Sequence, residues 1–163
     1  MFNKLKMYKI QIIGVSFSEP ELTPVLIFNN LFDGSYFSLP TDPFSAEILI
    51  RDYSGEGENS AAAWLSGILM EKSPNKACIK ITGDGGLSVL IKFGRVLRTV
   101  QGRYLSLGEG LAVARRLSLP VFAEESVIYL YGNSQSFEKE GFSLKKDFLI
   151  LSAESSYNGL FME

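Results

Sequence analysis

The sequence EGLAVARRLSLPVFA covers residues 109–123 and contains a change from a helix pattern to a strand pattern, which indicates the fold class. Its first eleven residues have the apolar spacing of a helix, and Glu109 lies in the first turn, where the helix dipole favours an acid. Pro120 ends this helix, because proline cannot continue one, and the three residues after it are typical of a short strand. A mixed class of helices and strands is therefore predicted.

Strand-like runs occur on both sides of this stretch. Their residues alternate or are β-branched, and they cover residues 8–17, 24–28, 36–39, 77–82, 87–93, 96–100, 104–107, 127–131 and 148–151. Two more helices are predicted. One begins at Pro43 after the N-cap Asp42, and its Glu47 and Arg51 have the spacing of an ion pair. The other covers residues 61–72. Since strands and helices do not alternate regularly, we predict an α+β fold with a mostly antiparallel sheet and three helices.

The chain of 163 residues has the length of a single compact domain. We expect residues 1–128 to form it and residues 129–163 to add an extension with two short strands and a mobile tail. The N-terminal sequence lacks the apolar run and cleavage site of a secretory signal, and no segment approaches the ~20 apolar residues of a membrane span. A cytoplasmic protein without a membrane partner is expected.

The sequence contains no histidine and a single cysteine. A Ser-His-Asp triad, a Cys-His pair and a His-ligated zinc are therefore excluded, as is an intrachain disulfide. Cys78 lies in an apolar run and is interpreted as a small core residue. No phosphate-binding glycine loop is present in the required context, so we expect no organic cofactor. Any hydrolytic chemistry must use carboxylates, hydroxyls, Lys, Arg or a metal ion held by oxygen ligands.

The net charge of −2 combines two unequal regions. Between Lys76 and Arg116 there are eight basic and two acidic residues, whereas the rest of the chain has eight basic and sixteen acidic ones. A basic field on an acidic protein can bind a polyanion such as DNA or RNA. The candidate nucleic-acid contacts are Lys92, Arg95, Arg98, Arg103, Tyr104, Arg115 and Arg116. The alternatives are a solvated hairpin whose cations pair with acids elsewhere and, for Tyr104, a half-buried strand tyrosine.

The order of elements and several short strings resemble the bifunctional nuclease domain family over about Tyr8 to Ile128. The strings are Thr23-Pro24-Val25-Leu26-Ile27, Leu39-Pro40 with residues 44–50, and Ala112 to Phe122 followed by Ala123-Glu124-Glu125. Members are small α+β proteins of bacteria and plants that oligomerise, and some are credited with cutting DNA and RNA. The resemblance implies a homodimer or higher homo-oligomer.

The chain departs from this family at two places. The family usually has Arg-Pro-Ser-Asp-Ala entering the third helix, where this chain has Ser106-Leu107-Gly108-Glu109-Gly110. The family's first helix usually begins with Gly-x-x-Glu-Ala, and Ser45 stands at the position of that glutamate. Only one acid of these two motifs is kept, as Glu109.

Two functions follow from these observations. The first is a nuclease in which Mg²⁺ or Mn²⁺, bound by Glu109 with Asp42 or Glu47 as its partner, activates water against a phosphodiester. For Glu109 the alternative is an acid placed at the helix N-terminus by the dipole, and for Asp42 it is an N-cap. The second function is a catalytically silent, oligomeric binding or scaffold protein that keeps the fold.

Overall fold

A computed structural model describes residues 6–18, 23–56, 60–83, 86–94, 102–131 and 149–152 of the chain. The strand predicted over residues 96–100, the tail after residue 152, and the candidate contacts Arg95 and Arg98 lie outside the described residues. No helix of the described ranges is both long and apolar enough to cross a membrane.

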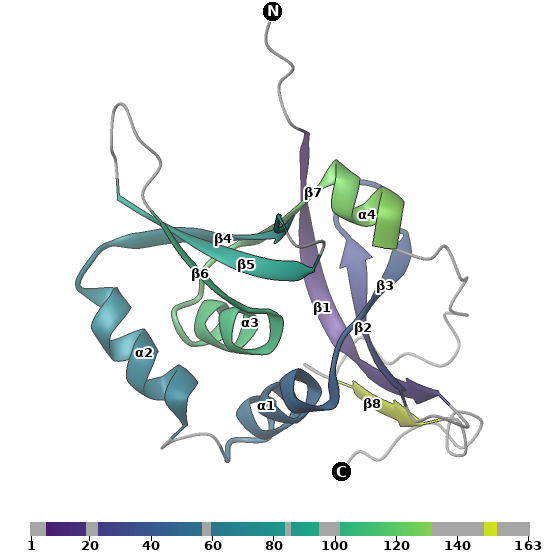
Figure 1. Ribbon diagram of the computed structural model, residues 1–163, viewed down its shortest axis with the longest axis horizontal. Coiled ribbons are helices and arrows are strands. Elements are labelled where there is room, and N and C mark those ends of the chain that lie inside the picture. The colour runs from purple at the N-terminus through teal and green to yellow at the C-terminus, as the bar shows by residue number, and fades with distance from the viewer. Residues whose placement is uncertain are drawn as a thin grey trace, which may run out of the picture.

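The described strands form one sheet in the order β3-β2-β1-β7-β4-β5-β6, with β8 paired to β1 (Figure 1). The bounds are β1 Met7–Ser18, β2 Thr23–Asn30, β3 Tyr36–Pro40, β4 Pro74–Ile81, β5 Leu87–Phe93, β6 Gly102–Ser106, β7 Val121–Glu124 and β8 Leu149–Ser152. The pairs β4–β7 and β1–β8 are parallel, and the other pairs are antiparallel. The predicted α+β class with a mostly antiparallel sheet is confirmed.

Four helices occur in the described part of the chain, not the three that were predicted. Their bounds are α1 Pro43–Tyr53, α2 Ala61–Met70, α3 Leu107–Arg116 and α4 Glu125–Tyr131. The extra helix, α4, replaces the strand predicted over residues 127–131, and it contains the predicted boundary between the main domain and the extension. The strand was predicted from the β-branched and aromatic residues of this segment. In the structure Val127 packs into the core from a helix, so burial outweighs strand propensity here.

Helix α3 lies at the centre of the fold, beneath β4 and β5 and beside α1 and α2, while α4 lies on the opposite side of the sheet (Figure 1). The core between α3 and the strands is apolar and includes Ala77, Ile79, Val89, Ile91, Leu111 and Ala114. Gly110 allows α3 to approach β5 closely, since a Cβ there would lie 2.3 Å from Cβ of Val89. This close packing fixes the side chains at the two ends of α3.

Candidate functional site

Glu109, the predicted metal ligand, lies in the first turn of α3 and is hydrogen-bonded to the N-cap residue of that helix. The N-cap is Ser106, whose Oγ accepts a hydrogen bond from the Glu109 backbone N–H at 3.2 Å and donates one to Glu109 Oε1 at 3.4 Å. The helix therefore begins two residues earlier than predicted, because Ser106 ends β6 and caps α3 at the same time. The alternative role for Glu109, an acid at the helix N-terminus, is present in the structure.

The other two predicted carboxylates also have structural partners. Asp42 is the N-cap of α1, and its Oδ1 accepts a hydrogen bond from the Ser45 backbone N–H at 2.7 Å. Glu47 lies further along α1 and forms an exposed ion pair with Arg51 at 3.1 Å. The predicted N-cap and ion pair of α1 are thus confirmed. Neither carboxylate forms a hydrogen bond or ion pair to Glu109 within the described residues.

The two places where the chain departs from the nuclease family lie against each other. A Cβ on Gly108 would be 2.6 Å from Cα of Ser45, so the first turns of α3 and α1 touch. Ser45 is buried, with only 2% of its surface exposed. In this chain a glycine and a buried serine fill the contact, without a charged side chain from either residue.

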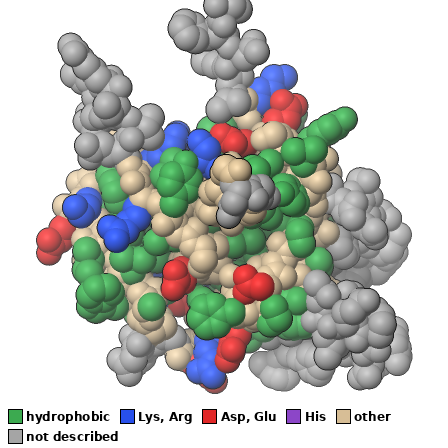
Figure 2. Space-filling view, viewed as in Figure 1, with side chains coloured by type: hydrophobic (Ala, Val, Ile, Leu, Met, Phe, Trp, Pro, Cys, Tyr) green, Lys and Arg blue, Asp and Glu red, His purple; other side chains and the backbone are tan. Residues whose placement is uncertain are grey.

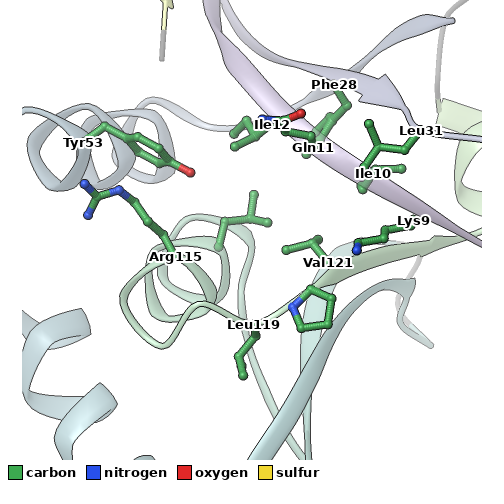
Figure 3. Close-up of a pocket in the computed structure, with 12 residues that line it drawn as sticks. Lys9, Ile10, Gln11, Ile12, Phe28, Leu31, Tyr53, Arg115, Leu119 and Val121 are labelled. Carbon is green, nitrogen blue, oxygen red and sulfur yellow. The ribbon is translucent and has the colours of Figure 1, made fainter. Parts of the chain in front are cut away.

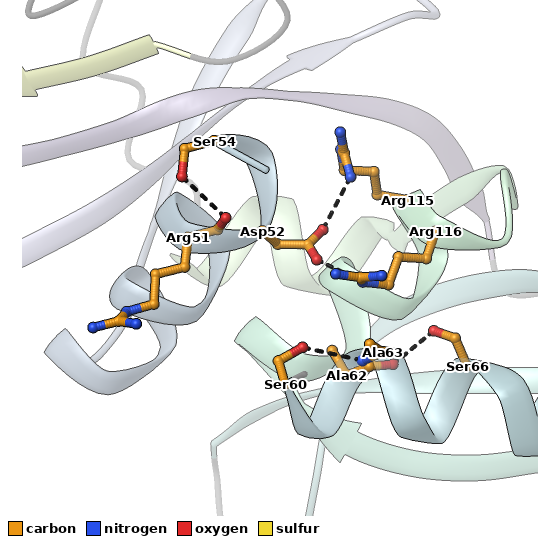
Figure 4. A network of polar contacts seen from close by, with 9 residues as sticks. All are labelled: Arg51, Asp52, Ser54, Ser60, Ala62, Ala63, Ser66, Arg115 and Arg116. Carbon is orange, nitrogen blue, oxygen red and sulfur yellow. Dashed lines mark hydrogen bonds and ion pairs between the residues drawn. The ribbon is translucent and has the colours of Figure 1, made fainter. Parts of the chain in front are cut away.

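Asp52, which the sequence analysis did not single out, anchors the C-terminal end of α3 to α1. It is buried, and its carboxylate accepts hydrogen bonds from Arg116 Nε at 2.6 Å and from Arg115 Nη1 at 3.2 Å (Figure 4). The Arg115 guanidinium also stacks over the Tyr53 ring, 4.6 Å from its centroid. Two candidate phosphate contacts are therefore engaged in joining two helices. We call Asp52, Arg115 and Arg116 the helix clamp.

Basic residues of β4 and β5 gather on the face of the sheet opposite to α3. Lys76 and Lys92 are directly opposite each other in the antiparallel register, and Lys80 lies on the same face four residues along β4. Lys76 and Lys92 make no ion pair with an acid of the described residues. Directly opposed like charges destabilise a β-sheet, so this pair is a cost to the fold. Figure 2 shows Lys and Arg side chains at the upper margin of the molecule, above β4 and β5.

Aromatic side chains lie among these lysines. Tyr104 is in register with Leu90, which places it on the same face as Lys92, and 56% of its surface is exposed. The Lys76 ammonium lies 5.5 Å from the centroid of the Phe122 ring on β7. We call the surface formed by Lys76, Lys80, Lys92, Tyr104 and Phe122 the basic sheet face. The structure thus brings together two predicted contacts, Lys92 and Tyr104, and adds three residues that the sequence analysis did not select.

Among the described residues, one acid lies on the basic sheet face. Glu124 is only 8% exposed and pairs with Lys80 at 3.2 Å. Burial alone lowers the pKa of Lys80, but the hydrogen bond and the charge of Glu124 outweigh it, so this pKa is raised above its usual value of 10.5. Lys80 is therefore charged and held in place, on the same face as Lys76 and Lys92 but four residues along the strand from that pair.

Cys78 lies on the same side of β4 and is completely buried, as the sequence predicted for a small core residue. Burial, followed by the nearby charge of Glu124, raises the pKa of its thiol to about 11. Such a thiol stays protonated at neutral pH and is a poor nucleophile.

The remaining predicted contact, Arg103, does not join this surface. Arg103 is in register with Ile91, whose side chain is buried beneath α3, so it lies on the other face of the exposed edge strand β6. Arg103 could have been distinguished from Lys92 and Tyr104 by the alternation of side chains along β4, β5 and β6, combined with the strand register.

A metal site built from several acids is not found in the described part of the chain. Its Cys, Asp and Glu side chains form no group of three or more that could hold a metal ion. A site in which Glu109 alone contributes a carboxylate is not tested by this observation, so Mg²⁺ or Mn²⁺ at Glu109 stays a prediction.

Comparison with known proteins gives no relative from which a function could be transferred. No protein-family model matches the chain, and no curated protein is significantly similar to it. The resemblance to bifunctional nuclease domains therefore rests on the short strings described above, and the functional argument rests on the side chains themselves.

Proposed function

We propose that this protein binds single-stranded nucleic acid through the basic sheet face and does not cut it. The observation that carries the proposal is the opposed pair Lys76 and Lys92 beside the exposed ring of Tyr104. Cations contact the phosphates of a single strand, while an aromatic ring stacks on its bases. The sheet bears the cost of two unpaired lysines in register, and a polyanion would remove that cost.

The positions of the carboxylates support binding rather than hydrolysis. Asp42 caps α1, Glu109 is hydrogen-bonded to the N-cap Ser106, and Glu47 is paired with Arg51. On the basic sheet face the one acid of the described residues, Glu124, is paired with Lys80. Each candidate metal ligand therefore already has a structural partner, which favours binding of a strand by the lysines over its hydrolysis.

Binding can be measured by fluorescence anisotropy with a labelled single-stranded oligonucleotide at low ionic strength. The double variant Lys76→Gln/Lys92→Gln should bind at least tenfold more weakly and reduce the slope of log affinity against log salt by roughly 1–2. Tyr104→Ala should weaken binding by about 1–3 kcal/mol. The matched control is Lys72→Gln, which removes an exposed cation just beyond α2. If the wild type does not bind at low salt, or if the control is as weak as the double variant, the proposal fails.

The hydrolytic hypothesis has its own test. Wild type and Glu109→Gln are incubated with single-stranded DNA or RNA, with and without Mg²⁺ or Mn²⁺. We expect no cleavage by either protein. Metal-dependent cleavage by the wild type that disappears in Glu109→Gln would instead establish the nuclease with Glu109 as its metal ligand.

We further propose that the protein self-associates through α2. This helix contains no charged residue, and Trp64, Ile68 and Met70 are exposed by 71%, 41% and 61%. Figure 2 shows hydrophobic side chains gathered over α2 at the lower left. Light scattering after size-exclusion chromatography should find a dimer or larger oligomer that Trp64→Glu converts to a monomer. Phe32→Glu, which changes an aromatic residue that is 78% exposed on the β2–β3 turn, should leave the oligomer intact.

A further inference from the structure

Strand β1 has a short segment without a partner on one of its sides. Its pairing with β7 ends at Ile10, opposite Val121, and its pairing with β8 begins at Gly14. Between these ladders, residues 11–13 have no partner on that side among the described strands. Pro120, which precedes β7, accepts a hydrogen bond from the Ala77 N–H of β4 at 3.0 Å, so its backbone is directed toward β4 and does not extend the ladder with β1.

A cavity of about 410 Å³ occupies this place. Its volume is in the range of small-molecule sites, which is roughly 300–1,000 Å³. Most of its wall is apolar and comes from β1, β2, α3 and the start of β7, with Ile10, Ile12, Phe28, Leu111, Leu119 and Val121 among the lining residues. An apolar wall of this kind favours a ligand with a hydrocarbon body.

The two cations that line the cavity lie at its opposite ends (Figure 3). Lys9 is exposed and makes no ion pair with an acid of the described residues. At the other end Arg115 lies over Tyr53, and a single Asp52 carboxylate is shared by Arg115 and Arg116. The side chains that line the cavity include no acid. Because Arg115 is already paired with Asp52, Lys9 is the cation of the lining that favours a negatively charged ligand.

The backbone of β1 adds a neutral donor. The Lys9 carbonyl accepts a hydrogen bond from the Leu31 N–H, so the polar backbone groups of Lys9 are directed toward β2. Backbone groups alternate in direction along a strand, which directs those of Ile10 and Ile12 to the other side. Ile12 lines the cavity, and its N–H lies in the segment without a strand partner. It can donate a hydrogen bond to a carboxylate.

We propose that this cavity binds a small organic acid with an apolar body. The hydrocarbon part lies against Ile10, Leu111 and Val121, and the carboxylate pairs with Lys9 and the Ile12 N–H. Lys9 is in register with Phe122 and so borders the basic sheet face, whereas Ile10, Leu111 and Val121 lie on the side of the sheet that α3 covers. The proposed binding of the acid does not depend on the proposed nucleic-acid binding.

Octanoate is a suitable probe, because it has an apolar chain and one carboxylate. Calorimetric titration of the full chain should give a dissociation constant of about 0.1–1 mM, the range for a ligand of about ten heavy atoms. Its neutral amide, octanamide, should bind at least fivefold more weakly. Backbone amide NMR shifts should be concentrated at Gln11 and Ile12 and be small at Trp64. No heat and no shifts with octanoate, or equal binding of the amide, would overturn the proposal.

Two kinds of variant locate the site. Lys9→Gln should weaken octanoate binding about fivefold, which is the loss expected for a partly exposed ion pair, and Lys72→Gln should not change it. Leu119→Trp places a larger ring in the cavity wall and should abolish binding. Leu31→Trp also places a larger ring in the cavity wall, from an exposed turn position. It replaces Leu119→Trp in the experiment if circular dichroism shows that Leu119→Trp is misfolded. Wild-type affinity in a folded tryptophan variant would place octanoate elsewhere and overturn the assignment.

Discussion

The cations of the helix clamp and of the basic sheet face come from the same basic segment of the sequence, but both cations of the clamp are paired with an acid, whereas among the described residues the opposed lysines of the sheet face are not. In the clamp, Arg115 and Arg116 share the buried carboxylate of Asp52. On the sheet face, Lys76 and Lys92 oppose each other without an acid between them in the described residues. The comparison teaches that local charge density does not identify a binding surface. The distinguishing feature is whether the fold already supplies the opposite charge.

The largest expected effect comes from breaking the clamp. Asp52→Asn leaves two partly buried guanidiniums without their carboxylate and should lower the free energy of unfolding by about 3 kcal/mol, near the lower end of the cost of breaking a buried ion pair. Urea unfolding followed by circular dichroism measures this loss. Glu47→Gln, which breaks the exposed pair with Arg51, is the control and should cost less than about 0.5 kcal/mol. Equal losses in the two variants would contradict the structural role of Asp52.

A smaller effect is expected at the other end of α3. Ser106→Ala removes the N-cap and should lower the free energy of unfolding by about 1 kcal/mol. The thermal transition should fall in parallel, whereas octanoate and oligonucleotide binding should be unchanged. A stability equal to wild type would mean that Ser106 and Glu109 are available for another role, and it would strengthen the hydrolytic hypothesis.

The protein is expected to become more stable when the opposed lysine pair of the basic sheet face is removed. Lys92→Glu places a carboxylate opposite Lys76 and should raise the free energy of unfolding by about 0.2–1 kcal/mol, because an opposed like-charge pair becomes an ion pair. The same variant should bind oligonucleotide more weakly than Lys92→Gln. Urea unfolding and anisotropy on one preparation test both statements. A loss of stability would show that the lysine pair is not a cost to the fold.

The smallest effect concerns the paired lysine of the sheet face. Because the pKa of Lys80 is raised above 10.5, its contact with Glu124 stabilises the fold fully below that pH and is lost as pH rises through the folded-state pKa. The difference in unfolding free energy between wild type and Lys80→Gln should therefore shrink at strongly alkaline pH. A difference that grows with pH would have the wrong sign for this contact.

Local signals were enough to predict several elements of the fold. Asp42 and Pro43 define the start of α1 because an N-cap and a first-turn proline act within one turn of helix. The strands predicted over residues 24–28 and 36–39 are present as β2 and β3, and the Asp33-Gly34 turn that joins them is also a local signal, since Gly34 has a φ of 77°. The interpretation of α4 as a strand was wrong, because the burial of Val127 and the partial burial of Ile128 depend on packing that no local window contains.

The site was harder to predict, for the same reason. Asp52 is separated from Arg115 by 63 residues, so its role depends on how α1 crosses α3. Lys76 could be recognised as a functional candidate only from its register with Lys92. By contrast, the capping roles offered as alternatives for Asp42 and Glu109 could be derived from their positions in a helix, and the structure contains both.

The contact between Gly108 and Ser45 limits which side chains the start of α3 can accept. A Cβ at Gly108 or Gly110 would overlap a neighbour, Ser45 in one case and Val89 in the other. A single larger side chain at either position would therefore separate α3 from α1 or from β5. Such a replacement needs a second, compensating change in the facing residue, so each glycine can vary only together with its neighbour.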